Sequence, residues 1–280
     1  MSTRTAISRK DVVVSVACVV FLLATLGAVG SSGRRRAKEA VCLSNLRQWG
    51  PAFHMFAEDN GGYFMEGWTN YGAQGPRHER YWMEALRPYY GNNHNLRCCP
   101  EASIPGTALG YSQYGGGGTF VGWGIFSGEC GQPSNAWDWV VGCDYGSYGM
   151  NAWVSNIEEG LNVWYGQDVY WRTPNVDGAG DVPLFGGHQF LDCWPNHSDE
   201  PPEYDGQPWM DTSQMGRVCI NRHSGFVNWV FLDGSARKVG IKELWTLKWH
   251  RIYVTDGPWT RGGGVMPCDW PEWMQEFEDY

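Results

Sequence analysis

The strongest hydrophobic signal in the chain is a single uncharged run close to its N-terminus. Residues 12–30 read VVVSVACVVFLLATLGAVG and contain no charged side chain. A helix of this length would extend over about 28 Å, close to the thickness of the hydrocarbon core of a bilayer. The run therefore predicts one membrane-spanning helix at about residues 12–30. A cleavable signal peptide, with small residues at Ala28-Val29-Gly30, and a buried core helix are the alternatives.

A second helical pattern follows this run at residues 34–59. Its apolar residues recur at spacings of two to four positions, which leaves one apolar face on a helix. Asn60-Gly61-Gly62 then supplies a helix-ending sequence. If the chain stays helical through residues 31–33, one rod of roughly 70 Å extends from about residue 11 to residue 59. Two separate helices joined at residues 30–33 are the alternative.

The clearest β signal lies at residues 226–239. Residues 226–232 are rich in β-forming side chains, and Asp233-Gly234 separates them from a second short run. An Asp-Gly pair between two such runs is typical of a hairpin with a type I′ turn. The spacing of apolar residues at 241–251 then predicts a short helix.

Composition adds long loops to this picture. The 280 residues include 38 glycines and 17 tryptophans, and residues 106–187 are glycine-rich and weakly periodic. We therefore expect an α+β fold of pilin-like type, with a long N-terminal membrane-spanning helix packed on a small antiparallel sheet that carries long Gly/Trp-rich loops. The expected division is an N-terminal segment at residues 1–33 and one exported globular domain at residues 34–280.

Charge is divided unevenly along the chain. The first 39 residues hold seven basic and two acidic side chains, so they carry +5. Because the net charge of the chain is −9, residues 40–280 carry −14. An acidic body is a poor match for nucleic-acid phosphates, so we expect no nucleic-acid partner. It is compatible with an exported domain, with cations or with a basic partner.

Cysteine content favours an oxidising compartment. One of the nine cysteines lies in the apolar run, and the other eight could form up to four disulfides in an exported domain. Cys98 and Cys99 are adjacent, and we expect one of them to pair with Cys42 or another distant cysteine. A disulfide between Cys193 and Cys219 is a further expectation.

Two patterns suggest metal binding, and neither is the favoured interpretation. Cys193-x3-His197 and Cys219-x3-His223 repeat a pair of zinc-binding residue types, although the spacing is not that of a standard finger and an oxidising compartment favours disulfides. Two carboxylates on the turn at residues 177–181 could bind calcium, but they offer few oxygen ligands. We therefore expect no cofactor.

No catalytic constellation stands out, and we expect a protein that is not an enzyme. His223 and Asp233 flank a predicted strand of about nine residues, which would separate them by roughly 30 Å. Structural roles explain both residues better. The alternative function is a glycan-binding surface module, because exposed tryptophans can stack on sugar rings, whereas buried ones would simply fill the core. Eight tryptophans lie in or near predicted loops: Trp68, Trp82, Trp123, Trp137, Trp139, Trp153, Trp164 and Trp171.

Two segments resemble a bacterial family of prepilin-like proteins. Residues 42–64 are similar to the helix end of that family. Arg222-His223, followed after nine residues by Asp233-Gly234, matches the H-X9-DG motif of its prepilin-type processing-associated domain, here at about residues 217–250. The resemblance implies a fold like that of type II secretion pseudopilins and type IV pilins, and a structural role in envelope filaments or secretion.

The resemblance also implies a location and partners. Such proteins hold a single-pass helix in the inner membrane, place the globular domain in the periplasm or cell envelope, and contact other pilin-like subunits or secretion-system components. Where family members carry Gly followed by Phe-Thr-Leu-Ile-Glu, this chain has Ile7-Ser8-Arg9-Lys10-Asp11. Asp11 stands in place of the glutamate, and we expect it to contact the amine of a neighbouring chain.

Overall fold

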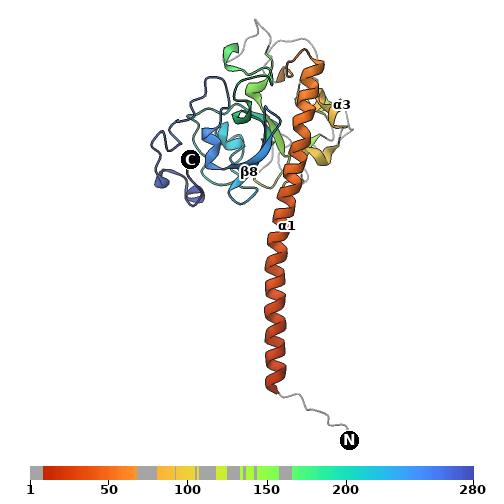
Figure 1. Ribbon diagram of the computed structural model, residues 1–280, viewed down its shortest axis with the longest axis vertical. Coiled ribbons are helices and arrows are strands. Elements are labelled where there is room, and N and C mark those ends of the chain that lie inside the picture. Colours follow the sequence, from red (N-terminus) through yellow and green to blue (C-terminus); the bar gives the residue numbers. More distant parts are fainter. Residues whose placement is uncertain are drawn as a thin grey trace.

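A long helix and a globular head form the molecule in the computed structural model (Figure 1). The structure describes residues 9–67, 81–91, 93–104, 106, 118–124, 133–134, 137–141, 144–157 and 166–280. Helix α1 (Arg9–Asp59) is continuous, so the prediction of one rod is confirmed and the break at residues 30–33 does not occur. The helix ends as expected, because Gly61 and Gly62 adopt φ values of 67° and 88°.

The head is built on a five-stranded sheet with the order β7-β5-β6-β8-β9. Neighbouring strands are antiparallel except for β5 and β7, which are parallel. The strands are β5 (Tyr148–Asn151), β6 (Pro183–Gly187), β7 (Asp192–Cys193), β8 (Phe226–Phe231) and β9 (Ala236–Gly240). The fold is therefore α+β with a small sheet, as the sequence predicted, but the sheet is mixed and not purely antiparallel, because β5 and β7 are parallel.

Short elements complete the described part of the head. Two small strand pairs are β1 (Trp123–Gly124) with β4 (Tyr145–Gly146) and β2 (Pro133–Ser134) with β3 (Trp137–Val141). Short α-helices are α2 (Trp82–Ala85) and α3 (Arg87–Tyr90). The 3-10 helices are η3 (His94–Arg97), η5 (Ala152–Val154), η6 (Gln167–Val169), η7 (Ala179–Asp181), η8 (Met215–Arg217), η9 (Lys242–Thr246), η10 (Pro267–Asp269) and η11 (Glu272–Met274).

The helix predicted at residues 241–251 is wrong, because only the 3-10 helix η9 forms there. The chain turns extended at Leu247, with φ −81° and ψ 151°. Trp245 and Trp249 lie on either side of this change and are both almost completely buried. Burial of two large rings has thus overridden the helical spacing of the local sequence.

The predicted hairpin is confirmed, although its turn differs from the expected type. Strands β8 and β9 pair in register from Phe226 opposite Gly240 to Val230 opposite Ala236. Gly234 has a φ of 80°, but Asp233 does not adopt a positive φ, so the turn is not type I′. Leu232 joins the loop instead, which lengthens it, and the Asp233 side chain accepts a hydrogen bond of 2.8 Å from the backbone N–H of Ser235.

The second half of α1 packs on the sheet through aromatic side chains. Trp49 is fully buried, and its ring centroid lies 4.8 Å from that of Phe185 on β6 and 5.3 Å from that of Trp82 on α2. Its indole N–H donates to the carbonyl of Leu96 over 2.8 Å. The core of the head therefore includes the docked half of α1, while the first half projects away from it (Figure 1).

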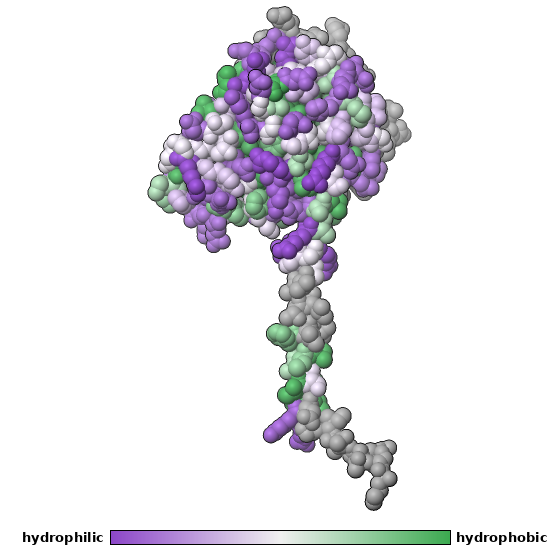
Figure 2. Space-filling view, in the orientation of Figure 1, coloured by the Kyte–Doolittle hydropathy of each residue, from purple (hydrophilic) through white to green (hydrophobic). Residues whose placement is uncertain are grey.

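The predicted membrane-spanning helix at about residues 12–30 is corrected by the structure. Within the described part of the chain, no helix is both long and apolar enough to cross a membrane. The exposed large apolar side chains described on the projecting half of α1 run from Val12 to Phe21 (Figure 2). The expected single-pass location in the inner membrane, with the domain in the periplasm or envelope, is corrected with it.

Gly50→Ala is expected to destabilise the head by about 1–3 kcal/mol, although alanine is the better helix former by about 1 kcal/mol. A Cβ at position 50 would lie 3.0 Å from the carbonyl oxygen of Gly234, in the backbone of the β8–β9 turn. Gly33→Ala is the matched control, because a Cβ there would have nothing within 4 Å. Urea denaturation measures both, and a Gly50→Ala protein as stable as the control would contradict the prediction.

Candidate functional site

Three side chains with metal-ligating atoms meet inside the head. Cys42 lies on α1, Cys99 follows η3, and His223 precedes β8. Their Sγ and ring nitrogen atoms all lie within 4.8 Å of one another, and all three residues are buried. The Cys99 Sγ is 3.4 Å from the His223 Nε2. We call Cys42, Cys99 and His223 the Cys-Cys-His cluster.

Local structure explains how each member reaches the cluster. Cys42 shares the buried face of α1 with Leu46 and Trp49, at helical spacings of four and seven. The backbone N–H of Cys99 donates to the Ser147 hydroxyl over 2.7 Å. The backbone N–H of His223 donates to the Phe226 carbonyl over 3.2 Å, which closes a tight loop before β8.

Backbone strain marks the same loop. Ser224, directly after His223, has a φ of 54°, and Gly225 follows with 92°. A non-glycine residue in this left-handed region costs roughly 1 kcal/mol or more, and such strain collects at functional sites. The strain therefore directs attention to His223.

A buried arginine lies beside the cluster. Arg222 is 4% exposed, and its guanidinium donates to the carbonyls of Thr119 (2.6 Å), His188 (2.8 Å) and Ser147. These backbone acceptors hold the cation in place without neutralising it. Its positive charge therefore remains available to stabilise a thiolate nearby.

The two thiols of the cluster have opposite pKa shifts. The hydrogen bond from Cys42, aided by His223 and by the charge of Arg222, lowers the pKa of Cys99 well below its ordinary value although burial opposes this. Burial raises the pKa of Cys42 well above its ordinary value. The Tyr148 hydroxyl donates to the Cys42 Sγ over 3.1 Å. Cys99 is therefore the more readily ionised thiol of the pair.

A pocket lies beside His223, the one member of the cluster that lines it, where α1 leaves the head. Its volume is about 280 Å³, and His223 and Arg222 form part of its wall. The other lining residues are Ser32, Arg35, Arg36, Glu39, Glu101, Ser224, Phe226 and Lys238. A small ion or a water molecule therefore has a route to His223.

The structure separates most of the predicted site residues. His223 and Asp233 lie beyond opposite ends of β8, as expected, and Asp233 and Gly234 serve the turn. His223 joins Cys42 and Cys99, whereas Cys193, His197 and Cys219 take part in no metal-ligating group of three among the described residues. The carboxylates of Asp177 and Asp181 are exposed, and no third ligand joins them in the same part of the chain.

Among the cysteines that the structure describes, none of the expected disulfides is formed, and Cys130 and Cys143 lie outside the described residues. Seven cysteines are present as free thiols: Cys18, Cys42, Cys98, Cys99, Cys193, Cys219 and Cys268. Cys42 nevertheless lies close to one of the two adjacent cysteines, because the Cys99 Sγ is within 4.8 Å of the Cys42 Sγ. The side chain of Asp11, the expected assembly residue, lies outside the described residues.

The tryptophans give no support to a glycan-binding surface where they are described. Trp82, Trp123, Trp153 and Trp171 are all less than 9% exposed. The side chains of Trp68, Trp137, Trp139 and Trp164 lie outside the described residues. The described members therefore serve the core rather than a sugar-stacking platform.

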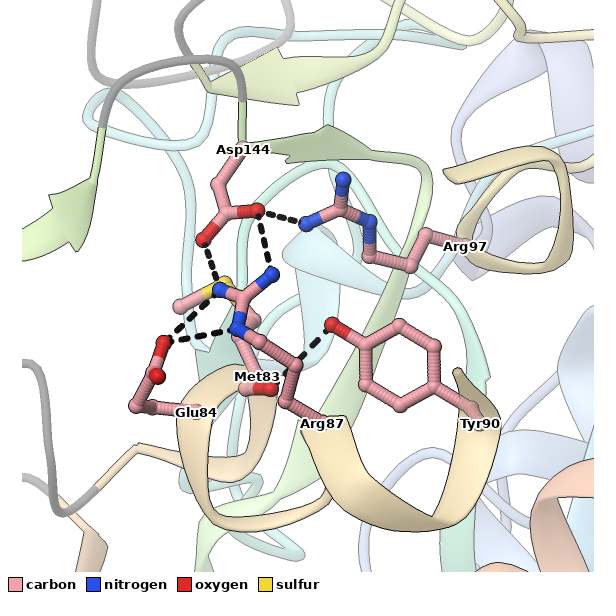
Figure 3. A network of polar contacts seen from close by, with 6 residues as sticks. All are labelled: Met83, Glu84, Arg87, Tyr90, Arg97 and Asp144. Atoms are coloured by element: carbon pink, nitrogen blue, oxygen red, sulfur yellow. Dashed lines mark hydrogen bonds and ion pairs between the residues drawn. The ribbon is translucent and has the colours of Figure 1, made fainter. Parts of the chain in front are cut away.

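A second polar network joins the short helices to the strand region (Figure 3). The carboxylate of Asp144 binds the guanidinium groups of Arg87, at 2.7 Å, and of Arg97. Arg87 also binds Glu84 over 2.8 Å, and the Tyr90 hydroxyl donates to the Met83 carbonyl. Because the charged side chains of this network pair with one another, we assign it to stability rather than to chemistry.

Sequence reasoning missed the Cys-Cys-His cluster as a unit, and it missed Arg222. Cys99 and His223 are 124 positions apart, so no spacing rule joins them. The sequence signals were the unusual adjacent cysteines and the motif histidine, which separately suggested disulfides and a structural role. Comparisons with family models, with curated proteins and with solved structures each found no match.

Proposed function

We propose that the chain is a non-enzymatic structural subunit of pilin-like type, which assembles with other copies of itself through the projecting half of α1. The observation that carries this proposal is the exposed apolar surface of that half. Val13, Val16 and Phe21 are 66%, 57% and 69% exposed, and four further valines there, Val12, Val14, Val19 and Val20, are each more than half exposed.

These apolar residues surround the helix instead of forming one stripe. Val12, Val13 and Val14 are consecutive, so their side chains point about 100° apart. A helix that is apolar all round is normally buried on every side. One partner helix would cover one face only, so we infer packing against several like helices.

Charge favours copies of this chain as the partners. Arg34, Arg35 and Arg36 form an exposed basic band on α1, and residues 40–280 carry −14 as derived above. Parallel helices in exact register would bring these basic bands together, which is unfavourable. A stagger along the helix axis instead places the band of one subunit near the acidic head of the next. Asp11 remains the expected contact to the amine of a neighbouring chain.

The full chain is expected to form oligomers that grow with concentration in sedimentation velocity, and Val16→Glu/Val20→Glu should weaken them by at least about 100-fold. Burying each valine contributes about 1.5 kcal/mol or more, and burying a glutamate there is unfavourable. Thermal unfolding of the head should not change. Ile252→Glu is the matched control, because Ile252 is 64% exposed on the head. A wild-type chain that stays monomeric, or an equal effect of the control, would contradict the proposal.

A further inference from the structure

The geometry of the Cys-Cys-His cluster points to a zinc site, and we propose that Cys42 Sγ, Cys99 Sγ and His223 Nε2 bind one Zn²⁺ ion. This inference is independent of assembly through α1. The residue types are those that zinc prefers, and all three are buried within the head.

The distances match a tetrahedral ion. With Zn–S of about 2.3 Å and Zn–N of about 2.0 Å, the sulfur and nitrogen atoms of two ligands should lie about 3.5 Å apart. The observed separation between Cys99 Sγ and His223 Nε2 is 3.4 Å. The other ligand atoms are within 4.8 Å, so small rotations of side chains would complete the triangle.

A candidate for the fourth ligand lies on β8. Asn228 is 1% exposed and its amide interacts with the Cys42 thiol, but neither its oxygen nor its nitrogen has a hydrogen-bond partner of good geometry among the described residues. A buried amide whose oxygen and nitrogen lack well-oriented partners is costly, which asks for an explanation. The amide oxygen can serve as a fourth donor, and a water molecule from the pocket is the other group able to fill that position.

Charge balance also favours a divalent ion. Two thiolates balance the charge of Zn²⁺, and a neutral imidazole adds no charge. The site with zinc bound is therefore neutral and places no further charge next to the buried Arg222. Tyr148 supplies a second-shell hydrogen bond to Cys42 over 3.1 Å. A disulfide between Cys42 and Cys99 would use the same two thiols but would leave both His223 and Asn228 without a role.

Such an ion would fasten α1 to the head. Its ligands come from the helix, from the segment after η3 and from the loop before β8. Because these three segments come together only in the folded state, zinc binds that state and not the unfolded chain, and it therefore stabilises the fold. Zinc here is thus structural, placed where the docked half of α1 meets the sheet.

The test is zinc content and cobalt spectroscopy of the full chain, purified under reducing conditions and then supplied with Zn²⁺ or Co²⁺. We expect one zinc ion per chain, and visible ligand-field bands with a thiolate-to-cobalt charge-transfer band. Cys99→Ser and His223→Gln should weaken binding by more than about 100-fold, since even second-shell changes cost up to that much. Cys98→Ser is the matched control, because Cys98 is adjacent and buried yet outside the cluster.

A second measurement covers the case in which a ligand variant does not fold. Chelation should lower the melting temperature of the wild-type and Cys98→Ser proteins, and Zn²⁺ but not Mg²⁺ should restore it. The proposal is overturned if the reduced wild-type protein binds no zinc, or if Cys98→Ser loses the metal as fully as Cys99→Ser. It is equally overturned if peptide mapping without reductant finds Cys42 and Cys99 joined by a disulfide in protein taken directly from cells.

Discussion

Asp144→Asn is expected to lower the free energy of unfolding by about 3–5 kcal/mol, one of the two largest effects we predict. Asp144 is 3% exposed, and its carboxylate binds both Arg97, 1% exposed, and Arg87. The neutral amide keeps the shape of the carboxylate but removes the negative charge from between two cations. The buried Arg97 and the partly buried Arg87, which keeps its ion pair with Glu84, are then left facing a group that also offers N–H donors, which makes the folded state much less stable.

Urea denaturation at neutral pH measures this loss, with Glu101→Gln as the matched control. Glu101 pairs with Lys38 over 3.1 Å, but the Lys38 side chain is 46% exposed, so the control should lose no more than about 1 kcal/mol. A double variant, Arg97→Met with Asp144→Leu, should recover part of the loss because no charge remains unbalanced at that position. Equal losses for Asp144→Asn and Glu101→Gln would show that burial of this network does not govern its strength.

Asp192→Asn is expected to make the protein more stable than wild type at neutral pH, by up to about 4 kcal/mol, but not at pH 4. Burial raises the pKa of Asp192 from 3.8 to about 7, although the charge of Arg217 opposes the shift. The folded state therefore keeps a proton that the unfolded state releases above pH 3.8. The stability that the protonated Asp192 side chain contributes is complete below pH 3.8 and is lost as the pH rises towards 7. Asparagine has no proton to lose.

A second buried group makes the wild-type profile flatter. Burial, with a smaller contribution from the charge of His197, lowers the pKa of His250 from 6.5 to about 4. The unfolded state then binds a proton that the folded state does not, so stability falls as the pH decreases from 6.5 to 4. In this range the effects of Asp192 and His250 oppose each other, and Asp192→Asn should reveal the His250 effect alone.

Chemical denaturation from pH 4 to pH 8 provides the measurement, and the exposed Asp211→Asn is the control, which should run parallel to wild type. The informative quantity is the difference between each variant and wild type, since other carboxylates contribute equally to both. A difference for Asp192→Asn that stays constant with pH would contradict the proposed burial of a protonated carboxyl group.

Local sequence predicted those parts of the fold that local chemistry determines. The end of α1 follows from Gly61 and Gly62, which adopt the positive φ that few other residues accept. The β8–β9 hairpin follows from Asp233-Gly234, although the inclusion of Leu232 in the loop changed the turn type. Each of these features depends on only a few neighbouring residues.

Features that depend on distant contacts could not be predicted in the same way. The Cys-Cys-His cluster requires α1, the end of η3 and the loop before β8 to meet, and no pattern in the sequence states that they do. The helical spacing at 241–251 was misleading because two tryptophans there are buried by the tertiary fold. The apolar run at residues 12–30 was interpreted from composition alone, whereas among the residues that the structure describes no helix is long and apolar enough to cross a membrane.

The continuity of α1 has a mechanical consequence. One helix runs without a break from the projecting half into the half that is docked on the sheet. A pull along its axis is therefore transmitted directly to the contacts of Trp49 and to the ion pair between Glu39 and Lys238, which is 2.6 Å long. These contacts lie along the helix and would be loaded in shear together, not peeled apart one at a time. In an assembly under tension, the head would then resist detachment as one unit, and the helix would act as a rigid tether.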